Sequence, residues 1–182
     1  MRTIKNTVFI TAAITVSGLA SAEQALEFVT IGDRQWAQVD QFNAVSGEEI
    51  ARVCPAGNCD AGTGQPLAGY DMTGWTWASE SDVAALFSAH SPFAGVDQEL
   101  AEANSTWGAA FFDTLGFRPT AESASGRALM GRTSTSPDIY RNVTGALSDF
   151  TDPAIGDAMT LQYWTPHHYT YANIGAFFYK DK

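Results

Sequence analysis

The amino-acid sequence predicts one small α+β domain behind a removable leader. A chain of 182 residues is long enough for one hydrophobic core and short for two independent domains. Apolar residues make up 45% of the chain and charged residues 16%, a balance typical of folded rather than disordered proteins. Helix start signals lie in the first part of the chain, and strand-like segments fill its end. This segregation predicts a few short helices, an antiparallel sheet and a loop-rich second half.

The start of the chain has the layout of a secretory signal peptide. Arg2 and Lys5 form a positive region, residues 8–19 form an apolar run, and the small residues 20–22 (Ala-Ser-Ala) precede Glu23. The apolar run is shorter than the stretch of about 20 residues that a membrane-spanning helix needs. We therefore expect cleavage before Glu23 and export of the remaining chain.

Export and acidity limit the classes of partner. We expect a signal peptide over residues 1–22 and a single globular domain over residues 23–182, secreted or periplasmic in a bacterium. The chain has 20 acidic and 10 basic residues, and removal of Arg2 and Lys5 changes its net charge from −10 to −12. Such a surface repels phosphates and anionic lipids, so we expect no nucleic-acid partner and, after cleavage, no membrane span. It attracts cations and basic partners.

The two cysteines predict a structural disulfide. Cys54 and Cys59 enclose four residues that include a proline and a glycine, and an oxidising compartment favours their oxidation. A zinc site would need further ligands nearby, but the histidines (His90, His167 and His168) are distant in sequence. A thioredoxin-like redox motif would have two intervening residues.

The first elements are predicted by local turn and cap signals. Two apolar stretches, residues 26–29 and 34–39, flank Gly32-Asp33 and predict two short strands joined by a turn. The sequence Ser-Gly-Glu-Glu over residues 46–49 fits a capping box, which predicts a helix over Gly47–Val53. A loop rich in glycine and proline follows this helix.

An aromatic strand and an amphipathic helix are expected next. Residues 74–77 (Gly-Trp-Thr-Trp) predict a short strand whose two tryptophans share one face. Ser79 begins a second cap signal, and apolar residues with helical spacing over residues 83–90 predict a helix of about three turns. His90 would end this helix, where the negative end of the helix dipole favours a cation.

The second half is expected to be mainly strands. Residues 96–103 suggest a short acidic helix, and residues 107–115 a better one that Gly116 ends. The polar and glycine-rich gaps that follow separate four predicted β segments, residues 127–133, 138–147, 158–164 and 174–179.

No residue pattern in the chain identifies a catalytic site. A Gly-x-Ser-x-Gly nucleophile motif is absent from the sequence. The cluster of Asp149, Asp152 and Asp157 offers oxygen ligands that calcium favours, but it lacks the spacing of a calcium-binding loop. We expect solvated turn residues there, with calcium as the alternative and no other cofactor. The five tryptophans are expected in the core, with a sugar-stacking surface as the alternative: Trp36, Trp75, Trp77, Trp107 and Trp164.

A polar and aromatic segment near the end of the chain is the predicted binding site. Loops on a rigid scaffold often carry recognition, and this segment lies between two predicted strands. Adjacent histidines on a strand point to opposite faces, so the pair predicts no metal site by itself. The expected binding residues are Trp164, His167, His168, Tyr169 and Tyr171.

Three segments resemble a broad group of exported bacterial domains. Residues 74–87 (GWTWASESDVAALF) resemble a Gly-Trp-Arg-x-Ala/Pro-Thr-x-x-Glu-x-x-x-Leu segment of PEP-CTERM-type exported proteins and of the C-terminal domain of collagen-like bacterial adhesins. Residues 131–135 (GRTST) resemble a later Trp/Tyr-Thr-Ser-Thr element, and residues 174–179 resemble the closing strand. Thr76 replaces the usual arginine, and Asp82 stands where glutamate is common.

The resemblance implies a C-type-lectin-like α+β fold and carries over no catalytic residue. The Glu-Pro-Asn and Trp-Asn-Asp calcium patterns of true C-type lectins are absent from the sequence. Fold alone does not fix function, so carbohydrate binding is an analogy here.

These observations favour an exported, non-enzymatic domain of the bacterial surface or matrix that binds a glycan or a protein partner. The alternatives are an exported hydrolase that uses carboxylates or a histidine-bound metal, and an envelope protein with a purely structural role.

Overall fold

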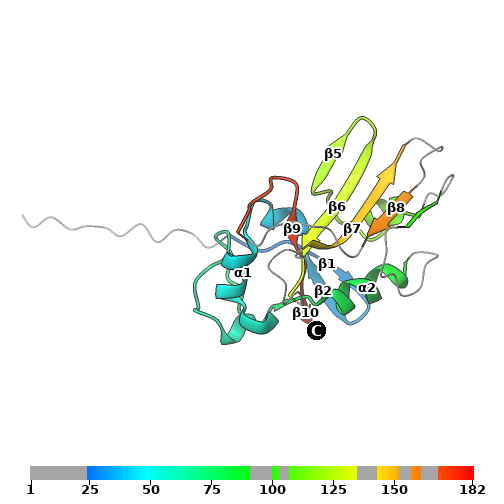
Figure 1. Cartoon of the computed structure of the whole chain (residues 1–182). Helices are drawn as coiled ribbons and strands as arrows, with labels where there is room; N and C mark the ends of the chain where they lie inside the picture. The colour runs from blue at the N-terminus through cyan, green and yellow to red at the C-terminus, as the bar shows by residue number, and fades with distance from the viewer. Residues whose placement is uncertain (1–23, 91–99, 103–106, 135–142, 152–156, 161–167) are drawn as a thin grey trace, which may run out of the picture.

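The computed structural model describes residues 24–90, 100–102, 107–134, 143–151, 157–160 and 168–182. The strands are β1 (Phe28–Ile31), β2 (Arg34–Ala37), β3 (Thr76–Trp77), β4 (Leu100–Glu102), β5 (Ala121–Ser123), β6 (Gly126–Arg132), β7 (Val143–Phe150), β8 (Asp157–Thr160), β9 (Gly175–Ala176) and β10 (Phe178–Asp181). The α-helices are α1 (Gly47–Val53), α2 (Glu80–Ser88) and α3 (Ala109–Asp113), and the 3-10 helices are η1 (Val39–Phe42), η2 (Pro55–Gly57) and η3 (Cys59–Ala61). Short helices beside two largely antiparallel sheets agree with the expected small α+β domain (Figure 1).

The first sheet joins the two ends of the domain. Its strand order is β1-β2-β10-β3, and all of its neighbours are antiparallel. The predicted hairpin at residues 32–33 is confirmed: β1 and β2 pair with Val29 opposite Trp36, and Gly32 has a φ of 58° in the turn. On the other side of β2, Tyr179 of β10 lies opposite Trp36.

The second sheet contains the strands from the second half of the chain. Its order is β4-β8-β7-β6-β5, and β9 pairs in parallel with the end of β6. The helix expected over residues 96–103 is wrong in its described part. Residues Leu100–Glu102 form β4, which pairs with β8 so that Leu100 lies opposite Met159. Pairing with a neighbouring strand outweighs a weak local helical pattern, because the main-chain groups that face β8 gain hydrogen-bond partners.

The predicted capping box at Ser46 and the predicted cap at Ser79 are both confirmed. The Ser46 hydroxyl accepts a bond from the Glu49 N–H at 3.2 Å, and a Glu49 carboxylate oxygen accepts the Ser46 N–H at 3.0 Å. Ser79 and Asp82 form the same reciprocal pair at the start of α2. The helix expected over residues 107–115 is shorter than predicted, because α3 covers Ala109–Asp113.

The closing segment differs from the single strand expected over residues 174–179. It forms β9 in the second sheet and β10 in the first, with Phe177 between them. The Phe177 N–H donates to the Arg132 carbonyl at 3.1 Å, and the Phe177 carbonyl accepts the Ala78 N–H at 2.9 Å. This segment therefore links the two sheets, which diverge from it in Figure 1.

Two groups of buried side chains form the core, and the closing segment contributes to both. Phe177 belongs to the group that contains Leu129 and Leu147, and Phe178 belongs to the group that contains Trp77 and the two cysteines. Trp36, Trp75 and Trp77 are buried, as expected. Trp107 is partly buried against the first group, and Trp164 lies outside the described residues.

The predicted disulfide is confirmed. The sulfur atoms of Cys54 and Cys59 are 2.08 Å apart, and both side chains are buried. The Cys59 N–H donates to the Trp75 carbonyl at 3.3 Å, so the bridge fixes the loop before β3. In the described part of the chain, no helix has the length and apolar character to cross a membrane.

Candidate functional site

The described part of the expected binding segment is an exposed aromatic loop. We call residues 168–171 the aromatic loop; it leads into β9 and is drawn in red in Figure 1. Tyr169 is 53% exposed, and its ring centroid lies 4.5 Å from that of His168 and 6.3 Å from that of Tyr171. Trp164 and His167, the other two expected binding residues, lie outside the described residues.

A buried arginine holds the main chain of this loop. Arg132 is the last residue of β6 and is fully buried, and its Nη2 donates to the Tyr169 carbonyl at 2.7 Å. Burial lowers the pKa of Arg132, and the nearby Tyr171 acts against this shift. A charge-assisted hydrogen bond of this kind is stronger than one between neutral groups, so it positions the loop firmly.

Further main-chain bonds fix the end of the aromatic loop. The Tyr171 carbonyl accepts the Ala44 N–H at 2.9 Å and the Ile174 N–H at 3.2 Å. Ala44 has a φ of 63°, a conformation that is rare for a residue with a side chain. The loop is thus held both by the second sheet and by the segment after η1. An anchored loop loses little conformational freedom on binding, which favours recognition of a partner.

Arg132 is the functional candidate that sequence reasoning missed. Its own carbonyl accepts the Trp77 indole N–H at 3.1 Å and the Phe177 N–H, so the residue lies where β3, β6 and the closing segment meet. The available signal was an arginine at the end of a predicted, largely apolar strand. Nothing in the sequence indicated that its partner would be the Tyr169 carbonyl.

The third histidine has a structural position. The His90 ring lies just beyond the end of α2, and its Nδ1 donates to the Leu86 carbonyl at 3.0 Å. The ring also meets Phe111 edge-on, with centroids 6.2 Å apart. These contacts fit the expected interaction with the end of the helix.

Two of the three clustered aspartates come together on adjacent strands. Asp149 of β7 accepts a hydrogen bond from Arg127 at 2.6 Å, and the fully buried Asp157 of β8 accepts the Gly108 N–H at 2.6 Å. Burial raises the pKa of Asp157, and the neighbouring Asp149 raises it further. Asp152 lies outside the described residues. Among the residues that the structure places, no group of three or more His, Cys, Asp or Glu side chains could hold a metal ion.

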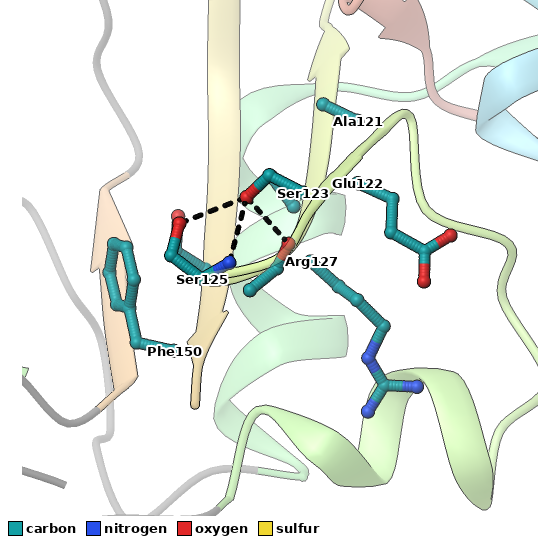
Figure 2. A pocket seen from close by; sticks show the side chains of 9 residues that line it. Ala121, Glu122, Ser123, Ser125, Arg127 and Phe150 are labelled. Atoms are coloured by element: carbon teal, nitrogen blue, oxygen red, sulfur yellow. Dashed lines mark hydrogen bonds between the residues drawn. The ribbon is translucent and has the colours of Figure 1, made fainter. Parts of the chain in front are cut away.

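A small pocket beside the β5–β6 hairpin shows no reactive arrangement. Figure 2 shows Ser123 and Ser125 hydrogen-bonded to each other across its wall, at 3.0 Å. The Arg127 side chain points away from these serines toward α3, where it binds Asp113 at 2.7 Å. The two serines therefore bond within the hairpin, and Arg127 links the hairpin to α3.

Known proteins do not add to these observations. No family model, curated protein or solved structure matches the chain.

Proposed function

We propose that the chain is an exported, non-enzymatic recognition domain of the bacterial surface or matrix, and that its aromatic loop binds a protein partner. The observation that carries this proposal is the exposed ring of Tyr169, which stands between His168 and Tyr171 on a main chain that Arg132 holds from within the core.

The chemistry of the aromatic loop favours a protein over a glycan. Tyrosine is enriched in the cores of protein interfaces, because it offers a large amphipathic surface for a small loss of side-chain freedom. No described residue of the aromatic loop lines the pocket beside the β5–β6 hairpin, and a saccharide would be expected to bind in a cavity. The acidic balance of the chain favours a partner with a basic surface around an apolar centre.

The resemblance to exported bacterial domains supports the location and the fold. Residues 74–87 carry the resemblance in the first half, and residues 131–135 in the second half include Arg132. A C-type-lectin-like topology belongs to this proposal, as do the signal peptide over residues 1–22 and the secreted or periplasmic location.

No described observation favours the hydrolase alternative. Asp149 and Asp157 each have a structural partner, in Arg127 and the Gly108 N–H. His168 is exposed beside Tyr169, on the same loop that we assign to binding.

Site-specific crosslinking in the exporting cell tests the proposal. A photoreactive phenylalanine analogue replaces Tyr169 in one protein and Glu122, which is exposed on β5, in a control protein. We expect a crosslinked protein of one defined size from position 169 and none from position 122. The identified partner is then purified, and its binding is measured by calorimetry.

Two variants separate this site from other exposed aromatic surfaces. Truncation of an interface tyrosine commonly costs more than about 1 kcal/mol, so Tyr169→Ala should weaken binding about fivefold or more. Phe28→Ala, which removes the other large exposed hydrophobic side chain among the described residues, should leave it unchanged. Equal loss in both variants contradicts the assignment of the loop. If the unaltered protein binds a glycan array and Tyr169→Ala abolishes that binding, the partner of the aromatic loop is a glycan rather than a protein.

A further inference from the structure

A cleft separate from the aromatic loop lies at the start of the domain. It is open to solvent and has a volume of about 390 Å³, and it lies between the segment before β1, strands β1 and β2, the loop before β3 and the end of β10. This volume falls within the range of about 300–1,000 Å³ that is typical of small-ligand sites. No residue of the aromatic loop lines it.

One wall of the cleft is aromatic. Phe28 is 46% exposed, although it lies on β1 next to the buried Trp75. The two ring centroids are 6.4 Å apart, and the ring planes are inclined at 54°. An exposed aromatic face in a concave surface can stack on an apolar face of a ligand.

The lining of the cleft also carries an oriented hydrogen-bond acceptor, Asp71. Asp71 Oδ1 accepts the Thr73 N–H at 2.9 Å and the Thr73 hydroxyl at 2.6 Å. These two bonds lower the pKa of Asp71, and the nearby Lys180 lowers it further, so the carboxylate is charged at neutral pH. Asp71 is thus oriented before any ligand arrives.

Hydrogen-bond donors complete the cleft. Lys180 extends over Gly74, whose φ is 77°, and a Cβ at Gly74 would lie 3.1 Å from the lysine Nζ. Gln35, on β2, adds a side-chain amide to the same lining. Within the described ranges, neither the Lys180 ammonium nor the Gln35 amide forms a hydrogen bond, so both remain available to a ligand.

We propose that this cleft binds an uncharged saccharide. A sugar ring offers a C–H face to Phe28, and each of its hydroxyls both donates, as Asp71 requires, and accepts, as Lys180 and Gln35 require. Asp71 and Lys180 carry opposite charges, which offset each other within the cleft. The whole chain carries a net charge of −10, so an acidic sugar would be repelled. This site does not depend on the proposed protein partner of the aromatic loop.

An NMR titration of the protein recovered after secretion tests the proposal. The probes are maltotetraose, cellotetraose and chitotetraose, with tetragalacturonate as an acidic counterpart, each at millimolar concentration. We expect at least one neutral probe to shift the Trp75 indole resonance and the Lys180 amide resonance. The resonances of His168 and Tyr169 should stay in place, because they lie outside the cleft.

Matched variants identify the groups that bind the sugar. Asp71→Asn keeps an oxygen that can accept the Thr73 bonds but loses the charge, and we expect it to weaken binding about tenfold. Phe28→Ala should weaken binding to a similar extent. Asp33→Asn, which changes an exposed carboxyl in the β1–β2 turn, should bind as tightly as the unaltered protein.

Three results would overturn the proposal. The first is no shift in the cleft with any neutral probe. The second is tighter binding of tetragalacturonate than of the neutral sugars. The third is shifts confined to the aromatic loop, which would place the sugar there. A melting temperature for each variant close to that of the unaltered protein shows that a loss of binding is not a loss of folding. The crosslinking result at Tyr169 is read separately, so either proposal can fail alone.

Discussion

Arg132 places a guanidinium where most sheets would hold a hydrophobic side chain. Its side chain is fully buried, and it donates to the Tyr169 carbonyl at 2.7 Å. Arg132→Met fills much of the same space but removes the donor. We expect the free energy of unfolding to fall by about 1–3 kcal/mol, because a carbonyl loses a charged partner. Urea denaturation measures this loss, and hydrogen exchange should show faster exchange of the amides in residues 169–174.

A surface arginine provides the control for this prediction. Arg34 binds Asp82 at 2.8 Å and Asp181 at 3.3 Å, and its guanidinium stacks on Tyr179 in the first sheet. Arg34→Met should therefore leave exchange in the aromatic loop unchanged. If Arg132→Met also leaves it unchanged, Arg132 does not position the loop.

Asp157 gives the protein an unusual dependence on pH. Burial, with Asp149 close by, raises the pKa of this carboxyl in the folded state above its unfolded value of about 4. The folded state then binds the Asp157 proton more tightly than the unfolded state does. The contribution of this proton to the free energy of unfolding is complete below about pH 4 and is lost as the pH rises through the folded pKa. Relative to Asp157→Asn, the unaltered protein should lose free energy of unfolding as the pH increases from about 4 to 7.

Urea denaturation of both proteins across this pH range tests the prediction. The quantity to compare is the difference in free energy of unfolding between the two proteins at each pH. Other carboxyls change the stability of both proteins in the opposite direction; for example, the hydrogen bond from Arg127 lowers the pKa of Asp113. Asp157→Asn retains an oxygen for the Gly108 N–H, so the fold should persist. A difference that is constant, or that increases with pH, would contradict the raised pKa.

At the residue scale, the sequence singled out candidate binding residues, which stay a prediction, but it did not indicate their structural partners. The aromatic loop was expected from its composition and its place between strands. Its anchor at Arg132 was missed, because the bond joins residues 37 positions apart through a main-chain carbonyl. The cleft was missed for the same reason: Phe28, Asp71 and Lys180 come from three distant parts of the chain.

The capping box at the start of α1 allows a direct test of one local signal. α1 has only seven residues, so its first turn is a large part of the helix. Ser46→Ala removes the acceptor of the Glu49 N–H and should lower the free energy of unfolding by about 1 kcal/mol. Ser46→Gly should cost only a few tenths of a kcal/mol, since glycine suits the cap backbone and leaves the N–H open to water.

Thermal or urea unfolding of the two variants provides the measurement. An equal loss in Ser46→Ala and Ser46→Gly would show that the side chain acts by packing rather than as a cap. Helicity measured by circular dichroism should change little, because α1 is a small part of the chain.

At the element scale, features with short-range causes were predictable. Both capping boxes, the turn at residues 32–33 and the disulfide depend on residues within five positions of one another. Strand partners were not predictable in the same way. The acidic segment around Leu100 forms a strand because β8 lies beside it, and its own sequence shows no clear period of two.

The whole molecule is expected to unfold as one unit, because the closing segment packs into both sheets. Gly175, in β9, lies directly on the main chain of η1: a Cβ there would be 1.8 Å from the Val39 carbonyl oxygen. Gly175→Ala therefore requires the main chain to move, at a cost of about 1–3 kcal/mol or more. We expect amide protection to fall together in β2 and in β6.

Hydrogen exchange read by mass spectrometry checks this coupling. Gly64→Ala provides the control, because a Cβ at this loop glycine meets open space and only its φ of 65° opposes a side chain. It should cost about 1–2 kcal/mol at most and should not change the exchange of β2 relative to β6. Loss of protection in only one sheet of Gly175→Ala would show that the sheets unfold independently.

Strand β10 lies between β2 and β3 in the first sheet. The β1–β2 hairpin is synthesised early, but it can pair with β10 only after residues 178–181 have been made. Contacts between such distant parts of a chain form slowly, because a long loop must close before they bring any gain. We therefore expect the first sheet to remain incomplete until its last strand has been made. For the export that we propose, such a delay would be useful, because a chain must pass through a narrow translocation channel before its tertiary structure forms.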